Sequence, residues 1–414
     1  MNARAYSHRT FAALAVRNFR LYFFGQLVSV SGTWMQSVAL GWLVLQTTGS
    51  SIDLGYVIAL QFVPMLLAGP YGGVVADRRR KRDILYVTQG VSGLLALALG
   101  LAVTLDQVSM PFLYVTAALL GVVNLFDNPA RQSFVQEMVG PELIANAVTL
   151  NSVLMNAGRL IGPGVAAAFI AVFGSAVCFY ANAVSYLAVL VALVAMRSAD
   201  FQPMRTVTRE KGQVRLGLRY VKSQPHLREV LVAMAAVGTF AYNFTVTLPL
   251  LARITFHAHS ASDYGVLTAA MGLGAVVGGL VMAYRARPTT ALLAGLSLAF
   301  AVALLLVGAM PSFTWDAVVL IPTGAISLAF ISTANSFVQT NSTQEMRGRV
   351  MSLFALAFLG TTPIGSLLVG VVVDHSNPRV GVWMGAVVAL GTGAYLVRAA
   401  AARRNAPQGV AAYR

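Results

Sequence analysis

Between residues 72 and 83 the chain reads Gly-Gly-Val-Val-Ala-Asp-Arg-Arg-Arg-Lys-Arg-Asp. Five consecutive cations, at positions 78–82, follow one long apolar run at 51–76 and precede another at 84–105. Loops rich in Lys and Arg stay on the cytoplasmic side of a membrane. This short polar stretch is therefore expected to be a cytoplasmic turn between two membrane-spanning helices, and it sets the orientation of the spans around it.

The composition of the whole chain is that of a polytopic membrane protein. Of its 414 residues 57% are hydrophobic and only 10% are charged, with a mean hydropathy of +0.72, whereas about a quarter of the residues of a soluble domain are charged. The net charge of +15 is explained by cations on cytoplasmic loops, so no nucleic-acid partner is predicted. The single cysteine, Cys178, allows no intrachain disulfide and has no neighbours spaced for a metal site. No cofactor is predicted.

Twelve mostly apolar runs are long enough to cross a bilayer as helices. In the first half they lie near 19–45, 51–76, 84–105, 110–136, 143–171 and 174–196, and in the second near 228–252, 262–284, 288–309, 315–340, 348–373 and 380–401. The fold class predicted is thus all-α and integral to the membrane. Counting spans outward from the cytoplasmic turn places both termini in the cytoplasm.

The distribution of charge supports this topology. With both termini inside, the tails, inner loops and inner helix ends carry 25 of the 29 Lys and Arg residues. Arg253 and Arg379 fall on the outer side, and Arg131 and Arg159 lie within predicted spans. The outer loops and outer helix ends instead carry aspartates, at positions 53, 106, 263, 316 and 374. A shifted model or one with eleven spans would lose this alternation.

The chain divides into two halves of six spans, residues 1–197 and 228–414, joined by a basic loop at 198–227. Within this loop, residues 214–222 read Val-Arg-Leu-Gly-Leu-Arg-Tyr-Val-Lys and mix apolar with basic side chains. Such a segment is typical of a short helix that lies on the inner leaflet. A solvated linker that only carries positive charge is an equally good interpretation.

The two halves are expected to be repeats of one another, because short matches recur at consistent offsets of 203 to 206 residues. The matched positions are Ser-Phe-Val-Gln at 133–136 and 336–339, Gly162 and Gly365, and Gly72-Gly73 and Gly278-Gly279. In the second copy Ala283 occupies the position of Asp77, so the charge is missing there. Repeats of six helices place a substrate site between the halves, near the middle of the bilayer.

The fourth span holds the densest set of polar residues within a predicted helix. Asn124, Asp127, Asn128 and Arg131 are spaced i, i+3, i+4, i+7, which puts them on one helical face. Asp127 and Arg131 can form an ion pair one turn apart, and Pro129 between them interrupts the backbone hydrogen bonds. Two interpretations stay open: a closed ion pair that fixes this helix to a neighbour, or a carboxylate whose protonation depends on which side the cavity faces.

A similar polar face on the fifth span contains Asn156, Arg159 and Pro163. Arg159 lies about 16 residues into its span, which is on the order of 24 Å along a helix and too deep for its side chain to reach the inner surface easily. Gly158 and Gly162 lie on either side of it, and this spacing of small residues favours close helix packing. Together with Asp127 and Arg131, Arg159 is predicted to take part in proton coupling.

Polar and aromatic side chains on the first, fourth, fifth, seventh and tenth spans are candidates for the substrate cavity. They are Gln26, Thr33, Trp34, Gln36, Asn124, Asn156, Tyr242, Asn243, Asn335 and Gln339. The alternative for each is a hydrogen bond between helices without any contact to substrate.

The turn quoted first resembles the loop signature between the second and third helices of the major facilitator superfamily, G-x-x-x-D-[RK]-x-G-[RK]-[RK]. The positions that carry the resemblance are Gly73, Asp77, Arg78, Lys81 and Arg82. Arg80 replaces the second glycine of the signature, so the turn can differ locally. A generic positively charged loop would explain the cations but not this spacing. The resemblance implies a gating loop at the cytoplasmic side.

Residues 158–167, Gly-Arg-Leu-Ile-Gly-Pro-Gly-Val-Ala-Ala, resemble the motif G-x-x-x-G-P-x-x-G-G of exporting antiporters, with Ala-Ala in place of the final glycine pair. The positions that match are Gly158, Gly162 and Pro163. Segments 39–50, 128–134 and 217–221 look like the enterobactin-exporter branch, which also includes macrolide and multidrug efflux proteins. By resemblance these segments favour export over import.

The resemblance implies a secondary active exporter of small amphipathic compounds, such as a drug, a siderophore or a related metabolite. It is expected to exchange them for protons by a rocker-switch movement of its two halves, as a monomer in the inner (plasma) membrane. An importer or a lipid flippase on the same scaffold is the alternative within this class. A membrane enzyme would need a catalytic cluster of His, Asp or Glu within the spans, and a sensor would need a soluble output domain; the sequence shows neither, so no enzymatic activity is predicted.

Overall fold

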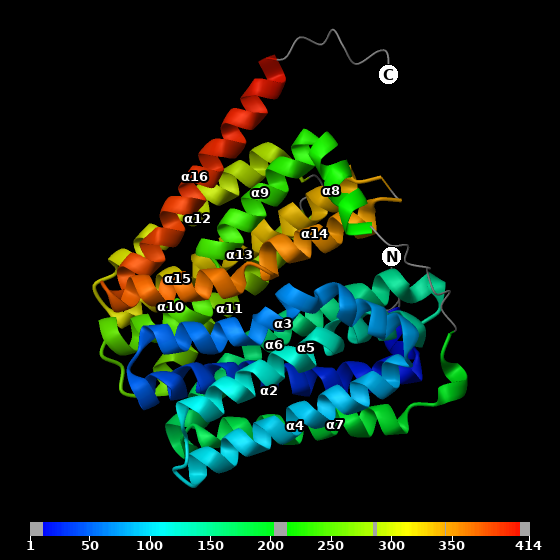
Figure 1. Cartoon of the computed structure of the whole chain (residues 1–414), viewed down its shortest axis with the longest axis vertical. Coiled ribbons are helices and arrows are strands. Elements are labelled where there is room, and N and C mark those ends of the chain that lie inside the picture. The colour runs from blue at the N-terminus through cyan, green and yellow to red at the C-terminus, as the bar shows by residue number, and fades with distance from the viewer. Residues whose placement is uncertain (1–10, 203–212, 285–287, 344, 406–414) are drawn as a thin grey trace, which may run out of the picture. The chain divides into compact units, whose positions relative to one another are not determined.

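The computed structural model describes residues 11–202, 213–284, 288–343 and 345–405, and within these ranges it contains helices and no strand (Figure 1). The all-α class predicted from the sequence is confirmed. The side chains of Asp77 and Ala283 lie outside the described residues, so the predictions that concern these two side chains stay predictions.

The helices follow one another with short connections. The first half of the chain forms η1 (Ala12–Ala15), α2 (Arg17–Thr48), α3 (Ser51–Arg78), α4 (Lys81–Thr104), α5 (Met110–Met138), η2 (Pro141–Leu143), α6 (Ile144–Phe173), α7 (Ala176–Ala195) and η3 (Ser198–Asp200). The second half forms α8 (Gln213–Ser223), α9 (Pro225–Phe240), α10 (Phe244–Leu250), η4 (Leu251–Thr255), α11 (Ala261–Tyr284), α12 (Thr290–Ala309), α13 (Phe313–Asn341), α14 (Arg347–Leu359), α15 (Thr362–Asp374) and α16 (Pro378–Asn405).

Twelve of these helical segments are long and apolar enough to cross a membrane, as predicted. Most begin and end within about three residues of the predicted limits. The agreement has a simple cause, because the thickness of the bilayer fixes the length of each apolar run.

Two spans are interrupted, which the apolar pattern did not predict. In the seventh span α9 and α10 are separated where the Asn243 side chain donates a 2.6 Å hydrogen bond to the Thr239 carbonyl; this side chain takes the place of a backbone amide. In the eleventh span α14 and α15 are separated just before Pro363, which has no amide hydrogen to continue the helix.

The seventh span also extends further than predicted. Its last turn, η4, is a π-helix that contains Arg253, a residue that the sequence placed beyond the span. A π turn holds one extra residue and occurs often at functional sites.

The described residues form two compact units. Unit 1 lies within residues 1–208 and 248–272, and unit 2 within 209–247 and 273–414. The chain passes from one unit to the other within α10 and again within α11, so each unit contains part of the seventh and eighth spans.

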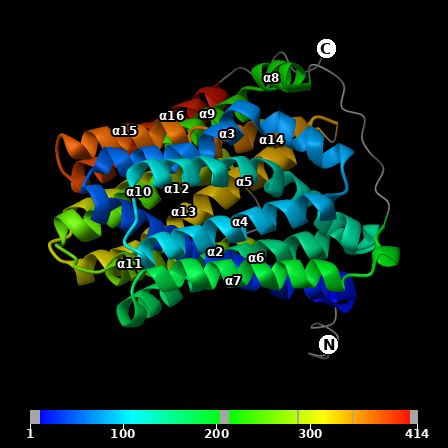
Figure 2. The same cartoon turned by 60° about the horizontal axis from the view of Figure 1, so that its bottom comes forward.

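In unit 1, α2 packs against α6 and α7, α3 packs against α5, and α4 packs against α7. Figure 2 shows α4, α2, α6 and α7 side by side. Glycines lie at the closest crossings: Gly72 of α3 lies directly against the Leu125 carbonyl of α5, and Gly162 of α6 lies against Ser31 and Trp34 of α2. Small residues let helices approach to backbone contact.

In unit 2, α12 packs against α16 and α13, and α9 packs against α14 and α16. Gly278 of α11 lies directly against the Ala325 carbonyl of α13, and Gly365 of α15 lies against the Thr239 carbonyl of α9. These contacts join the same pairs of spans as those of Gly72 and Gly162 in unit 1. They support the repeat that the sequence predicts.

The loop between the halves contains the amphipathic helix α8, while residues 203–212 lie outside the described residues. Gly217 of α8 faces Arg349 and Leu353 of α14, and the Tyr220 hydroxyl accepts a 3.2 Å hydrogen bond from the Thr343 amide. A helix is therefore present, whereas its position on the inner leaflet stays a prediction.

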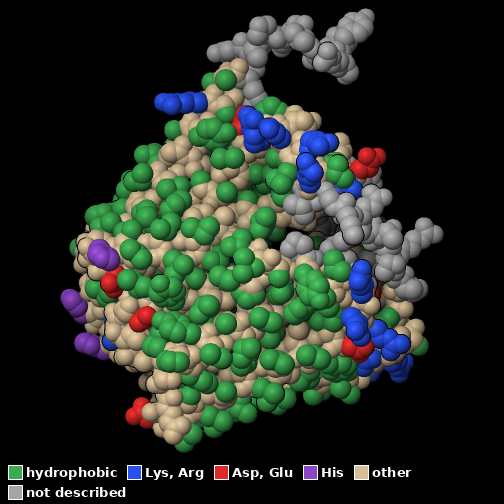
Figure 3. Space-filling view, in the orientation of Figure 1, with side chains coloured by type: hydrophobic (Ala, Val, Ile, Leu, Met, Phe, Trp, Pro, Cys, Tyr) green, Lys and Arg blue, Asp and Glu red, His purple; other side chains and the backbone are tan. Residues whose placement is uncertain are grey.

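The surface has the pattern of a membrane protein. In the space-filling view apolar side chains cover much of the visible face, and Lys and Arg side chains lie along its upper and right edges (Figure 3). Val87 of α4 and Val191 of α7 are about two-thirds exposed, at 65% and 66%. Such side chains are expected to face lipid.

Packing at Gly162 yields a prediction about stability. A methyl group at this position would lie 2.5 Å from both the Ser31 carbonyl oxygen and Trp34 Cβ, whereas at Gly164 of the same helix it would lie 3.9 Å from Ala269. We expect Gly162→Ala to lower the free energy of unfolding by about 1–3 kcal/mol and Gly164→Ala to change it little. Thermal unfolding of the purified variants in detergent measures the difference, and equal melting temperatures would contradict this packing.

Candidate functional site

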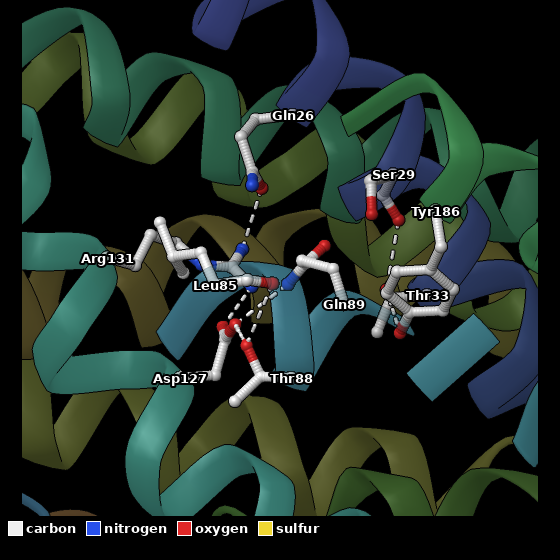
Figure 4. Close-up of polar contacts among 9 residues, drawn as sticks. All are labelled: Gln26, Ser29, Thr33, Leu85, Thr88, Gln89, Asp127, Arg131 and Tyr186. Atoms are coloured by element: carbon white, nitrogen blue, oxygen red, sulfur yellow. Dashed lines mark hydrogen bonds and ion pairs between the residues drawn. The ribbon is translucent and has the colours of Figure 1, made fainter. Parts of the chain in front are cut away.

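The centre of the candidate site is an ion pair within α5. Asp127 and Arg131 lie one helical turn apart, and Arg131 Nη2 pairs with Asp127 Oδ2 (Figure 4). The other carboxylate oxygen, Oδ1, accepts hydrogen bonds of 2.7 Å from Thr88 Oγ1 and from Gln89 Nε2, both of α4. The carboxylate is 1% exposed and thus makes its polar contacts inside unit 1.

The guanidinium group extends the network to α2. Arg131 Nη1 donates a 2.8 Å hydrogen bond to Gln26 Oε1, and Gln26 is fully buried. Side chains from α2, α4 and α5 therefore meet at one charge pair. Charges inside a membrane are costly unless they are paired and hydrogen-bonded, and this network meets that condition for both charges.

The network is not saturated. Gln26 Nε2, Gln89 Oε1 and Arg131 Nε are buried, and none of them has a hydrogen-bond partner among the described residues. Buried polar atoms without a partner are costly, so the hydrogen bonds of this network are incomplete in the structure.

Arg159 lies in a second contact within unit 1, between α6 and α2. Its guanidinium carbon is 5.4 Å from the centre of the Trp34 ring, a cation–π distance. Gly158 and Gly162, one turn apart on α6, allow this approach because they lie against the backbone and side chains of α2 at Val30, Ser31 and Trp34. On another side of α6, the Pro163 carbonyl lies beside Gly265 of α11.

The predicted gating loop is bonded to other parts of unit 1. Arg82 donates to the Leu193 carbonyl at 2.6 Å, to Ser198 Oγ at 2.8 Å and to Tyr86 Oη at 3.2 Å. This bonding ties the start of α4 to the end of α7.

The remaining loop positions differ in their surroundings. Lys81 forms a 2.8 Å salt bridge with Glu137 of α5. Arg78 is exposed, Gly73 is buried, and the Asp77 side chain lies outside the described residues.

The cavity candidates of the first half have partners within unit 1. Gln36 accepts a 2.8 Å hydrogen bond from Asn182 of α7, and the Thr33 hydroxyl lies 3.3 Å from that of Tyr186. Asn156 donates to the Ser152 carbonyl of its own helix at 2.8 Å. Asn124 is exposed.

The candidates of the second half have partners within unit 2. Tyr242 donates a 2.6 Å hydrogen bond to the Ser327 carbonyl, and its ring packs against those of Phe300 and Phe358 with centres 5.2 and 5.1 Å away. Gln339 donates to Asn335, one turn away on the same helix. Asn243, as described above, bonds the backbone of α9.

Thr88 and Gln89 were not predicted from the sequence as site residues. They form a polar pair within the apolar run 84–105, and that interruption is the signal that could have identified them.

The structure also shows a second fully buried carboxylate at Asp316 in unit 2, and neither of its oxygens has a hydrogen-bond partner among the described residues. Within the same described part of the chain no group of three His, Cys, Asp or Glu side chains could hold a metal ion.

Several curated proteins are similar to this chain over most of their length. The staphyloferrin A transporter of Staphylococcus aureus is 24% identical over 372 residues, which cover 86% of this chain and 89% of the relative. The multidrug efflux pump Tap of Mycolicibacterium fortuitum is 25% identical over 370 residues, with the same two coverages. The enterobactin exporter EntS of Shigella flexneri is 24% identical over 355 residues, covering 85% and 84%.

Solved structures show the same fold at lower sequence identity. A bacterial homolog of the human lysosomal transporter Spinster, in an inward-facing and unoccupied conformation, matches with a TM-score of 0.69 at 16% identity, covering 93% of this chain and 96% of that one. A POT family transporter in complex with a thioalcohol-conjugated peptide matches with a TM-score of 0.74 at 12% identity and the same coverages.

The family model described as transmembrane secretion effector matches residues 8–409, which is nearly the whole chain. Together with the twelve spans and the fold of the major facilitator transporters, this match confirms the family predicted from the sequence. The protein belongs to the transmembrane secretion effector family, a family of transporters and not of enzymes.

Proposed function

We propose that this protein is a secondary active exporter that moves small amphipathic compounds out of the cell in exchange for protons. The relatives named above include two whose names state export or efflux, of enterobactin and of several drugs. The proposed location is the plasma membrane, with both termini in the cytoplasm and the protein as a monomer. Two halves, residues 1–197 and 228–414, would rock about a central substrate site, and the linker helix α8 would rest on the inner leaflet.

The observation that carries the proposal is the buried pair of Asp127 and Arg131. As long as the carboxylate is charged, it balances Arg131 and accepts from Thr88 and Gln89. Adding a proton to Asp127 would remove that balance and leave Arg131 with neutral hydrogen-bond partners, Gln26 and the protonated carboxyl group itself. Because an unpaired cation inside a membrane is costly, protonation would favour a different arrangement of the network.

A change in the network would reach three helices. Arg131 belongs to α5, Gln26 to α2, and the donors to Asp127 belong to α4. A proton can shift a two-state equilibrium only if the two states bind it with different affinity. A carboxylate that is paired in one state and freed in the other provides such a difference, and this is the proposed link between proton binding and alternating access.

Arg159 is proposed to couple this event to substrate through Trp34. Both residues lie at the contact between α6 and α2, and Gln26 of the charge network lies on the same helix as Trp34, two turns away. The polar cavity candidates named in the sequence are proposed to contact substrate when their present hydrogen bonds open. The loop of Gly73, Asp77, Arg78, Lys81 and Arg82 is proposed to control the cytoplasmic gate.

Asp127→Asn tests the proton-coupling role. Asparagine keeps the shape of the side chain but cannot bind and release a proton in the pH range in which a carboxylate does. We therefore expect efflux driven by a pH gradient to fall at least about tenfold, while substrate binding is kept. The measurement is efflux of a compound panel from cells with and without the gene, before and after the pH gradient is collapsed. Asp53→Asn is the matched control, since the Asp53 carboxylate accepts a 2.6 Å hydrogen bond from Tyr114 and does not contact Arg131 in the charge network.

The outcome that contradicts this role is uphill transport by Asp127→Asn at a rate near that of the wild type. Should the variant fold poorly, Thr88→Val removes only one hydrogen bond to the carboxylate, worth about 1–3 kcal/mol when the charged partner is buried. We expect it to shift the pH dependence of efflux. Loss of a contact that is only structural would leave that pH dependence unchanged.

Arg159→Lys tests the second cation. Lysine keeps the charge but loses the planar group that stacks on Trp34, so we expect transport to fall severalfold at normal expression. Trp34→Leu should have the same effect, and Arg79→Lys, on the exposed loop, should have none. Full activity of Arg159→Lys would show that only a positive charge is needed.

Arg82→Gln tests the gating loop. The substitution removes the bonds of Arg82 to Leu193 and Ser198, so we expect α4 and the end of α7 to separate more readily. The measurement is the labelling rate of single cysteines placed at the cytoplasmic ends of these helices, with Arg80→Gln as the neighbouring exposed control. Unchanged labelling together with lost transport would argue against a gate and for a role in the substrate path.

A further inference from the structure

Unit 1 contains a cavity that the transport proposal does not use. It is a pocket open to solvent, with a volume of about 330 Å³, and lies where the end of α2 meets η4 and the residues that follow it. Its lining consists of Trp42, Gln46, Arg253, His257, Ala258 and His259. In the proposed topology this is the outer end of unit 1.

Arg253 is the central charge of this cavity. It lies within the π turn η4, and its guanidinium carbon is 5.7 Å from the centre of the Trp42 ring. Trp42 is 2% exposed, so the ring supports one side of the guanidinium group. On the other hand, Arg253 Nη1 is buried and has no hydrogen-bond partner among the described residues. A buried charged donor without an acceptor is unfavourable. Because Nη1 is closed to solvent, a ligand would reach it only after its neighbours move, whereas other atoms of Arg253 line the pocket.

The two histidines are brought to the cavity by an unusual backbone turn. His257 has a φ of 52°, in the left-handed region that non-glycine residues seldom adopt and that costs about 1–3 kcal/mol. The turn is stabilised because the Ala258 amide donates a 2.9 Å hydrogen bond to the Ala252 carbonyl, in η4. It places His257 and His259 around the same space as Arg253, and strain of this kind occurs often at ligand sites.

The chemistry of the lining selects the charge of the ligand. None of the six residues is acidic, and Arg253, Gln46 and both imidazoles can donate hydrogen bonds. A planar guanidinium group matches the two oxygens of a carboxylate or phosphate. A zinc ion is a poorer match, because the lining offers two imidazoles and no thiolate or carboxylate, beside a fixed positive charge.

We propose that this cavity, the Arg253 site, binds the carboxylate or phosphate group of a small organic anion. Arg253 is the main contact, and His257, His259 and Gln46 complete the set of donors. The inference concerns binding and does not depend on the direction or the coupling of transport. The same chemistry would accept the phosphate of an anionic lipid, so the source of the anion is part of the test.

The test is calorimetric titration of citrate, and separately of inorganic phosphate, into the purified full-length protein in phosphatidylcholine nanodiscs. We expect saturable binding that weakens about tenfold to a hundredfold in Arg253→Gln and by an intermediate factor in Arg253→Lys, which keeps the charge without the fork. His257→Gln and His259→Gln, at exposed positions, should each weaken it by less. His375→Gln and Arg228→Gln, which replace exposed residues outside the cavity, serve as controls.

A repetition in nanodiscs that contain phosphatidylglycerol identifies the source of the anion. Competition of the lipid with citrate in the wild type, but not in Arg253→Gln, would assign the site to a lipid headgroup, and unchanged citrate affinity would assign it to a soluble anion. The proposal is overturned if neither citrate nor phosphate binds, if Arg253→Gln binds them as the wild type does, or if zinc binds instead and is lost with the histidines. Thermal unfolding of each variant establishes that it is folded. If Arg253→Gln is not folded, the two histidine variants test the proposal in its place.

Discussion

A charge pair in an apolar environment is the constraint on which the structure of unit 1 depends. Taking Asp127 and Arg131 out of water costs several kcal/mol for each ion, and their attraction offsets that cost only with good geometry and further hydrogen bonds. The structure provides these bonds from two other helices, through Gln26, Thr88 and Gln89. The positions of α2 and α4 around α5 are therefore set by a polar requirement as well as by packing.

Close packing at glycines holds other pairs of helices together in unit 1. In a membrane such contacts come from small residues at the crossings rather than from the hydrophobic effect. Gly72 supports the approach of α3 to α5, and Gly158 and Gly162 support that of α6 to α2. The antiporter-like motif thus has a packing role that is visible in unit 1, next to the functional role proposed for Arg159.

The sequence predicted the spans well and the site only in part, and the reason is physical. Bilayer thickness imposes a length on every apolar run, so twelve spans can be counted without knowledge of their neighbours. The pairing of Asp127 with Arg131 could also be predicted from the sequence, because both residues lie on one helix at a spacing of four. Thr88 and Gln89 reach the pair from another helix, and the left-handed turn at His257 depends on a bond to η4; tertiary contacts of this kind leave no periodic pattern in the sequence.

The comparison of the two halves indicates why the charge pair is present at all. At the offset of 203 residues that relates Ser133 to Ser336, Asp127 corresponds to Phe330 and Arg131 to Ala334. Both are buried, at 1% and 0% exposure, in a helix of the same length. Apolar residues in place of a buried ion pair are often neutral or stabilising by about 1–4 kcal/mol, so helix packing at this position does not need the charges. The contrast between Asp127 and Arg131 in unit 1 and Phe330 and Ala334 at the matching positions supports the proposal that the charge pair takes part in proton coupling.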